Sequence, residues 1–220
     1  MSFARYAQDW IGSESIDIKK IRAQRVDRFL KREFPKARIA LKYGTNIQLL
    51  VAVILSAQCT DKKVNEVTEE LFKKYKIAKD FASANPEKFE KEIRPTGFYK
   101  NKAKNIIASC KIIQEKFGGK LPRTMEETLT LPGVARKTAN VVLGNAYGIM
   151  DGIAVDTHMI RINQKLGFSE HSDPVKIEKD LMEIIPKKDW FGYTYRIIEY
   201  GRNVCPARHK KCDCEIYKIR

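Results

Sequence analysis

The chain has 220 residues, of which 42 are Lys or Arg and 27 are Asp or Glu, so its net charge is +15 at pH 7. This length allows a buried core, and the charge favours a polyanionic partner, although a basic protein with merely solvated lysines has the same composition. The longest apolar run, residues 49–57, is too short to span a bilayer, and residues 1–10 lack a secretory-signal pattern. We therefore expect an intracellular protein without a membrane span.

Apolar residues recur at helical spacing along most of the chain. Pro35 ends the first such segment, Asn85 and Pro86 begin a short one, and Gly118 is one of two glycines that end the longest. No long stretch alternates at period two. The sequence thus predicts an all-α protein with a polar, loosely ordered extension at residues 1–20. The predicted helices cover residues 21–34, 47–57, 61–75, a short segment from 85, 100–117, 124–131, 137–147, 157–166, 174–185 and 193–205.

A tight turn at residues 132–135, Pro-Gly-Val-Ala, joins two of the predicted helices. The second helix would begin with N–H groups that lack intrahelical partners and with the positive end of its dipole, and both suit a phosphate oxygen. A helix–turn–helix corner packed only for structure has the same pattern. Arg136 and Lys137 follow the turn directly and favour the phosphate site, with Gly133, Ala135 and Arg136 as candidate DNA contacts.

Lys137 lies on the first turn of the predicted helix 137–147. The helix dipole disfavours an ammonium there, and desolvation would add to this effect, leaving a neutral amine that can attack carbon. Most helical lysines are nonetheless simply solvated charges. Asp156 precedes the next predicted helix and suits its N-cap. As an alternative or an addition, its carboxylate can stabilise positive charge at a sugar carbon or relay a proton.

Two loops carry further candidates for DNA contact. Residues 56–61, Ser-Ala-Gln-Cys-Thr-Asp, are either a connector that caps the next helix or a loop that enters duplex DNA. In the second case Gln58 would fill the space left by an extruded base, because its amide both donates and accepts hydrogen bonds. Residues 97–102, Gly-Phe-Tyr-Lys-Asn-Lys, are either an aromatic corner with solvated lysines or a backbone contact with Lys102 near a phosphate.

The five cysteines form two groups. Cys59 and Cys110 are isolated in helical patterns, where a buried, inert thiol is expected. Cys205, Cys212 and Cys214 lie close together, which in an intracellular protein favours a metal over a disulfide. A four-iron cluster and a structural zinc each take four ligands, so these three thiolates would need a neighbouring His or Asp as the fourth.

In combination, these motifs resemble those of the endonuclease III family of helix-hairpin-helix DNA glycosylases and AP lyases. The resemblance covers about residues 38–212 and implies two all-α domains with DNA in a cleft between them. One would be a six-helix domain, residues 39–150, that contains the hairpin, and the other would combine residues 21–38 with 151–220 and end in the cysteine loop. The blocks that carry the resemblance are Leu55–Asp61, Gly97–Ala103, Leu131–Asn140 and Ala154–His158.

The resemblance also implies roles for single residues. Lys137 matches the family's catalytic lysine, Asp156 its essential aspartate, and Gln58 the residue that fills the vacated base position. Ala135 departs from the family's usual glycine, and if that position needs a positive φ, alanine costs about 1–2 kcal/mol. The cysteines depart further, because the second gap is one residue instead of two and a fourth cysteine is absent. The sequence therefore predicts no firm cofactor, and a [4Fe-4S] cluster would be incomplete.

The function that the resemblance implies is base excision repair. Such a DNA glycosylase with AP lyase activity removes damaged, oxidised pyrimidines through a lysine Schiff base and cleaves the strand by β-elimination. The expected partner is double-stranded DNA with a damaged base or an AP site, bound by a monomer in the cytoplasm or nucleoid. One alternative is a monofunctional mismatch glycosylase of the same superfamily, which generally lacks the hairpin lysine. The other is a non-catalytic DNA-binding helix-hairpin-helix protein.

Overall fold

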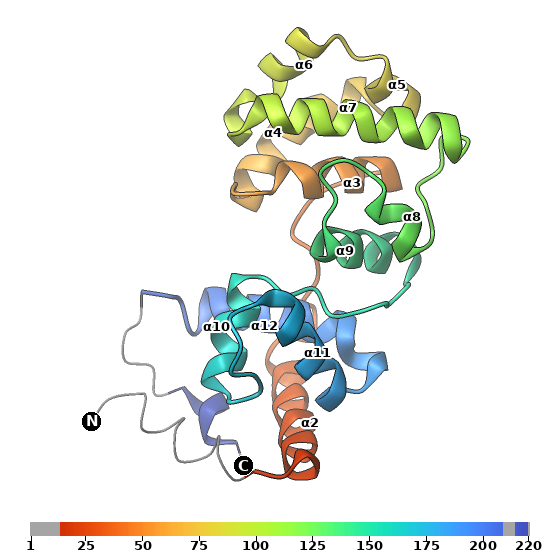
Figure 1. The fold of residues 1–220 in the computed structure, drawn as a ribbon. Helices are drawn as coiled ribbons and strands as arrows, with labels where there is room; N and C mark the ends of the chain where they lie inside the picture. The colour runs from red at the N-terminus through yellow and green to blue at the C-terminus, as the bar shows by residue number, and fades with distance from the viewer. Residues whose placement is uncertain (1–13, 209–213, 220) are drawn as a thin grey trace. The chain divides into compact units, whose positions relative to one another are not determined.

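The computed structural model describes residues 14–208 and 214–219, and in these residues all regular secondary structure is helical (Figure 1). The predicted all-α class is confirmed. The described residues form two compact units, one of residues 39–151 and the other of residues 14–38 with those from 152 onward. Within the described ranges, no helix combines the length and the apolar character that a membrane span requires.

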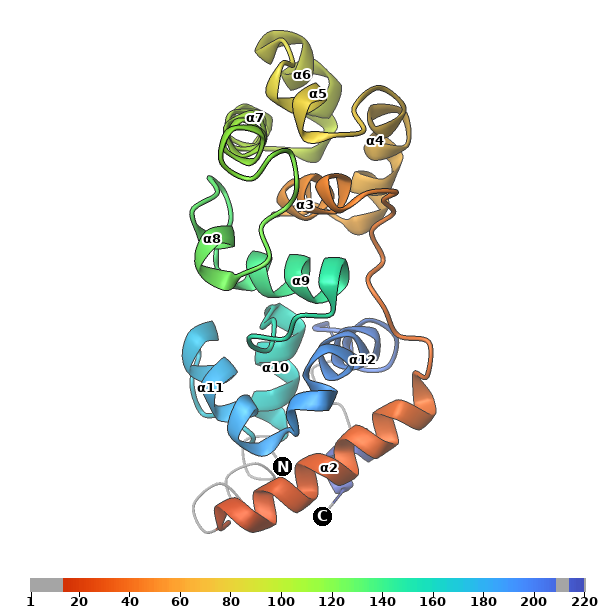
Figure 2. The same cartoon turned by 90° about the vertical axis from the view of Figure 1, so that its right-hand side faces the viewer.

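The first unit, residues 39–151, is built around α3 (Asn46–Leu55), whose residues from Ile47 to Leu55 are all buried. This helix is apolar on every side because α4, α7 and α9 all pack against it (Figure 2). The other helices of this unit are α4 (Asp61–Lys74), α5 (Ala78–Ala82), α6 (Pro86–Ile93), η1 (Arg94–Thr96), α7 (Tyr99–Lys116), α8 (Met125–Leu129) and α9 (Arg136–Tyr147).

Capping side chains set where several of these helices begin. The side chain of Asn85 accepts a hydrogen bond from the Lys88 N–H (3.0 Å), and Pro86 follows at the first position of α6. Thr124 Oγ1 accepts from the Glu127 N–H at 3.2 Å, at the start of the predicted helix 124–131. Hydrogen bonds between residues that are close in the sequence therefore define these helix starts.

The second unit contains α2 (Ile16–Glu33), which begins five residues before the predicted start. Ser15 explains the difference, because its hydroxyl caps the helix at the Ile18 N–H. Thus only part of the predicted extension, residues 1–20, lies outside the described residues. The other helices of this unit are α10 (Thr157–Lys165), α11 (Pro174–Ile184), η2 (Lys187–Asp189), α12 (Trp190–Asn203) and η3 (Glu215–Lys218).

Polar contacts inside the second unit fix α2 and α10 against α12. Asp27 of α2 is buried and pairs with Arg196 of α12 at 2.6 Å. The hydroxyl of Tyr193, also on α12, donates to Asn163 Oδ1 of α10 at 2.6 Å inside the apolar core. Because Asp27 and Tyr193 each have a partner, these contacts orient the helices without leaving an unsatisfied charge at either residue.

Candidate nucleic-acid interface and active site

The predicted turn between two helices is the connection between α8 and α9, and a glycine is required in it. Gly133 has a φ of +79°, a region that side chains with a Cβ rarely adopt. A Cβ at this position would also lie 2.9 Å from Nδ2 of Asn105, which is on α7. Both the backbone conformation and the space around it therefore exclude larger residues.

Helix α7 holds this hairpin from the side. The Ser109 hydroxyl donates to the carbonyl oxygen of Pro132 at 2.7 Å, and the Val134 N–H closes the turn on the Leu131 carbonyl at 3.1 Å. Sequence reasoning did not identify Ser109 or Asn105 as supports, because neither lies near the hairpin in the chain. Ser109 is nevertheless fully buried, and its spacing from apolar residues of α7 was a usable signal.

Ala135 is the N-cap of α9 and has φ −93° and ψ 170°, which is extended backbone. Alanine is therefore not strained at this position, because the backbone here does not need a positive φ. Its side chain also has no acceptor for the first-turn N–H groups of α9. A helix start without a capping side chain leaves this role to another acceptor, and a phosphate oxygen is one that fits.

Lys137 is the second residue of α9, directly after the hairpin, and its side chain is exposed. Arg136, the first residue of the helix, is partly exposed. The described residues thus leave the Lys137 side chain open to solvent.

Asp156 is the N-cap of α10, as one of the two interpretations predicted. Its Oδ1 accepts a hydrogen bond from the Met159 N–H at 2.8 Å, and its side chain remains partly exposed. The Oδ1 atom is thus bound to the helix backbone, whereas Oδ2 is the carboxylate oxygen that could take part in a reaction. Asp156 belongs to the second unit, whereas Lys137 belongs to the first.

Charged side chains surround the start of α10. Burial lowers the pKa of His158, the Asp156 carboxylate opposes this shift, and Arg161 and Arg202 add to it. The Arg161 guanidinium also donates to the Gly201 carbonyl at 3.3 Å, which ties α10 to α12. Arg161 and Arg202 were not identified from the sequence, because Arg202 approaches the start of α10 only through the packing of α12.

Gln58 lies in the short loop between α3 and α4 and is exposed. Its φ is +52°, an uncommon conformation for a residue with a side chain. The Cys59 N–H closes the loop on the Ser56 carbonyl at 3.1 Å, and Thr60 then caps α4 through the Lys63 N–H at 3.2 Å. The loop is therefore ordered by its own hydrogen bonds, with the Gln58 amide on the outside.

Lys102 does not have the environment expected of a phosphate contact. Its side chain is 5 % exposed, and its Nζ donates to the carbonyl oxygens of Leu55 and Thr96, each at 2.8 Å. The ammonium is turned into the protein because these two carbonyls are acceptors at the ends of helices. This finding corrects the interpretation of Lys102 as a DNA-binding residue.

The structure tests only part of the prediction that the cysteines form two groups. Cys110 is buried, and burial raises the pKa of its thiol to about 12. The Cys205 thiol is buried too, and its Sγ lies 3.4 Å from both an Arg161 nitrogen and the Tyr217 hydroxyl. Cys212 lies outside the described residues, and Cys214 is inside them.

Protein groups surround Cys205 in the described residues. In the part of the chain that the structure describes, no three His, Cys, Asp or Glu side chains gather in a metal-binding arrangement. The Cys205 sulfur is instead contacted by protein groups, and the Lys165 Nζ is a further one at 3.7 Å.

Comparison with known proteins gives a consistent result. Residues 51–187 match the model of the HhH-GPD superfamily base excision DNA repair proteins. Endonuclease III of Synechocystis sp. is 51% identical over 199 residues, which cover 90% of this chain and 91% of the relative. Endonuclease III of Bacillus subtilis is 44% identical over 188 residues, which cover 84% of this chain and 85% of the relative.

Two solved structures share the fold over most of their length. A trapped endonuclease III–DNA covalent intermediate is 42% identical with a TM-score of 0.83, over 89% of this chain and 91% of that one. A non-covalent endonuclease III–DNA complex is 40% identical with a TM-score of 0.85, over 91% of this chain and 94% of that one. With its hairpin, its lysine at the start of α9 and these likenesses in sequence and fold, the chain belongs to the endonuclease III family of the HhH-GPD superfamily.

Proposed function

We propose that this protein is a base excision repair DNA glycosylase with AP lyase activity that acts on oxidised pyrimidines. The observation that carries the proposal is the exposed Lys137, on the first turn of α9 and directly after a hairpin that fits only glycine at position 133. A trapped covalent DNA intermediate of a relative that is 42% identical supports an amine nucleophile. The substrate, DNA, is consistent with the expected intracellular location.

In the first step, the amine of Lys137 displaces the damaged base from the sugar. The lone pair of Lys137 Nζ forms a bond to the anomeric carbon as the bond from that carbon to the base breaks, and the base leaves with the bonding pair and takes up a proton. The nitrogen then loses a proton and the sugar ring opens, its oxygen keeping the electron pair and taking up a proton. The product is a protonated Schiff base between Lys137 and the sugar.

The second step breaks the strand. The Schiff base acidifies the sugar's 2′ protons, and loss of one of them drives the expulsion of the 3′ phosphate as the bond from the 3′ carbon to oxygen breaks. Water then hydrolyses the Schiff base and returns the Lys137 amine. The Asp156 carboxylate stabilises the positive charge that develops on the sugar and assists the proton transfers.

The remaining assigned residues bind the DNA. The start of α9, with Gly133, Ala135 and Arg136 around it, holds a phosphate near the lesion, because the capping residue has no acceptor of its own. The exposed amide of Gln58 occupies the space that the extruded base leaves in the duplex. A monomer is sufficient, since every group named here comes from one chain.

Borohydride trapping on a duplex with one thymine glycol tests this function. Wild-type protein should yield a reduced covalent adduct, and Lys137→Ala should yield none, while Lys111→Ala, which removes an exposed lysine of α7, should match wild type. Asp156→Asn should slow base release about 100-fold or more, because a positioned acid or base contributes 10²–10⁴-fold. If wild type releases the base without forming an adduct, the protein is a monofunctional glycosylase. If wild type shows no base release and no adduct, the proposal is overturned.

A further inference from the structure

Lys102 has a buried ammonium that the reaction proposed above does not use. It lies on the first turn of α7, and its own N–H bonds the Phe98 carbonyl at 3.1 Å. Burial lowers the pKa of its ammonium, although the neighbouring Cys59 thiol opposes this shift. A buried lysine is costly unless its donors have acceptors, and here two carbonyls provide them.

The two carbonyls belong to segments that are far apart in the sequence. Leu55 is the last residue of α3, and Thr96 is the last residue of η1. A cation at the end of a helix is favourable, because the last carbonyls lack partners and carry the negative end of the dipole. The ammonium therefore closes two helix ends at once and ties them to the start of α7.

Each of these helix ends leads directly into an unusual loop. Gln58 follows Leu55 by three residues, and Phe98 follows Thr96 by two. They are the two non-glycine residues with a positive φ in the described parts of the chain, at +52° and +48°. Both side chains are exposed, and that of Phe98 is 63% exposed. Two loops thus expose an amide and an aromatic ring, and the buried Lys102 is hydrogen-bonded to the backbone just before each loop.

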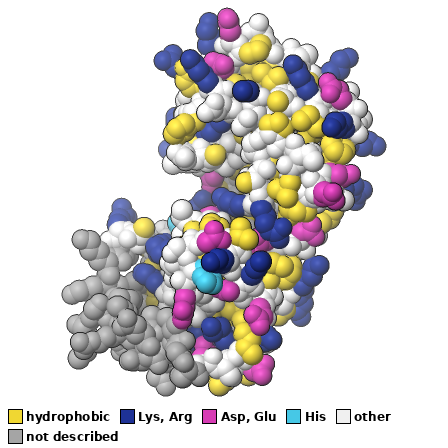
Figure 3. All heavy atoms as spheres, viewed as in Figure 1, with side chains coloured by type: hydrophobic (Ala, Val, Ile, Leu, Met, Phe, Trp, Pro, Cys, Tyr) yellow, Lys and Arg dark blue, Asp and Glu magenta, His cyan; other side chains and the backbone are white. Residues whose placement is uncertain are grey.

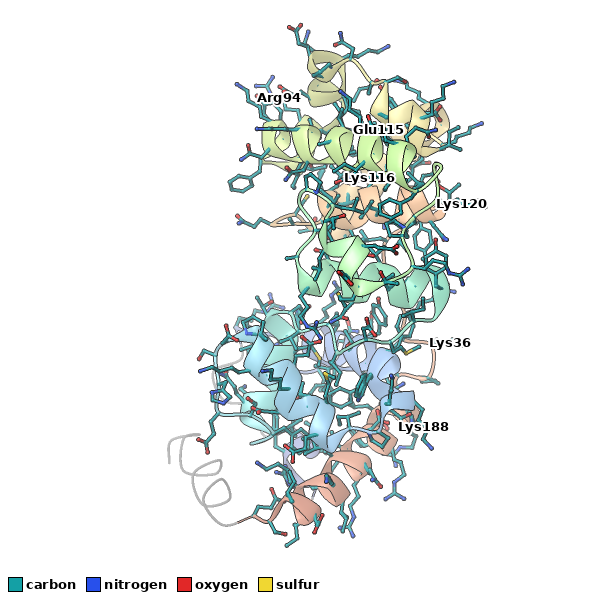
Figure 4. All side chains as sticks on the ribbon, turned by 45° about the vertical axis from the view of Figure 1, so that its right-hand side comes forward. Lys36, Arg94, Glu115, Lys116, Lys120 and Lys188 are labelled. Carbon is teal, nitrogen blue, oxygen red and sulfur yellow. The ribbon has the colours of Figure 1, made fainter. Side chains whose placement is uncertain are left out.

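Positive φ at residues with a side chain is strained and persists only where surrounding contacts hold it. The hydrogen bonds of Lys102 act immediately before both loops, at Leu55 and at Thr96, where they limit how the two segments can shift. Arg94, also in η1, lies beside the start of α7 and is exposed, so this end of the unit also carries positive charge (Figure 4).

We propose that Lys102 is a positioning residue that holds the Gln58 and Phe98 loops in one register, so that both meet duplex DNA together at an extruded base. The inference rests on the proposed function, because it assumes that Gln58 enters the duplex. It assigns the buried lysine no contact with DNA. Its effect should therefore be confined to substrates in which a base stack has to be opened and filled.

Lys102→Met removes the ammonium and keeps most of the side-chain volume. On a thymine-glycol duplex, kcat/KM should fall about tenfold or more, since misplacement of a supporting group by an ångström can cost up to about 100-fold. On a single-stranded oligonucleotide with an AP site, where no stack has to be filled, strand cleavage should stay within about twofold of wild type. The matched control is Lys104→Met, which removes an exposed lysine of the same helix and should change neither activity.

Two additional variants separate positioning from general stability. Lys102→Arg retains a cationic donor and should restore most of the duplex activity. On a Gln58→Ala background, Lys102→Met should cost much less than it does alone, because residues that act as a unit are not additive. If circular dichroism finds Lys102→Met unfolded, Lys102→Gln, which keeps an amide donor, replaces it in every assay.

The fluorescence of 2-aminopurine opposite an AP-site analogue reports the loops directly. Wild type and Lys104→Met should change this fluorescence on binding, and Lys102→Met should reduce the change at saturating protein. Equal losses on the duplex and the single strand, or no loss on either, would overturn the positioning role. A wild-type protein that cleaves neither substrate would instead overturn the proposed function, so the two failures are distinguishable.

Discussion

Two lysines of the first unit show how strongly the surroundings of a residue determine its role. Lys137 and Lys102 each lie on the first turn of a helix. From the sequence, Lys137 was the candidate catalytic lysine and Lys102 a candidate contact with DNA. The structure leaves Lys137 exposed and buries Lys102 against two carbonyls. Position on a helix therefore does not separate an exposed lysine from an internal anchor, but the acceptors that surround the nitrogen do.

At the same scale, His158 should make stability depend on pH. Its folded pKa is lowered, mainly by burial, so the unfolded chain binds this proton more readily. The folded protein should therefore lose stability as the pH falls below about 6.5, the ordinary value for histidine. His158→Asn should reduce the difference between the unfolding midpoints at about pH 5.5 and about pH 7.5.

His171→Asn serves as the control, because this histidine is exposed. It should show the same dependence of the unfolding midpoint on pH as wild type. If His158→Asn shows that dependence as well, other groups are responsible for it.

Among the elements, the hairpin between α8 and α9 has the least tolerance for change. Gly133→Ala combines a positive φ with a Cβ placed 2.9 Å from Asn105. The backbone conformation alone should lower the free energy of unfolding by about 1–2 kcal/mol. Urea unfolding measures this loss, and a shift of the hairpin should also weaken binding of the lesion duplex.

A double variant distinguishes the two causes at this glycine. Asn105→Ala removes the side chain that a new Cβ would meet, so Gly133→Ala should cost less on that background than in wild type. If the cost is unchanged, backbone conformation alone requires the glycine. If Gly133→Ala has no effect on stability or binding, the hairpin is not constrained as described.

Sequence reasoning predicted the helices well because their signals are local. Asn85 caps its helix where the pattern predicted, and Thr124 and Asn46 lie within one residue of the predicted starts of their helices. The direction of a single long side chain is not local. Lys102 precedes Ile106 by four residues, so it shares a face with the core, and this spacing was the available signal that its ammonium points inward.

On the scale of the whole molecule, positive charge dominates the surface. The net charge is +15, and Figure 3 shows Lys and Arg side chains spread over the visible face of both units. Affinity for duplex DNA should therefore fall steeply with salt, by about 10³-fold or more between 50 and 200 mM if about six phosphates are contacted. Fluorescence anisotropy at several salt concentrations measures the slope, and an affinity that does not change with salt would rule out a grip on the backbone.

The second unit is discontinuous in the chain, since residues 14–38 join those from 152 onward. During synthesis, residues 39–151, with Lys137, leave the ribosome as a complete unit, while the helix at 16–33 still lacks α11 and α12 to pack against. The second unit, which contains Asp156, can complete its fold only after α11 and α12 have also emerged, because both pack against the helix at 16–33. The order of synthesis thus separates the folding of the unit that contains Lys137 from that of the unit that contains Asp156.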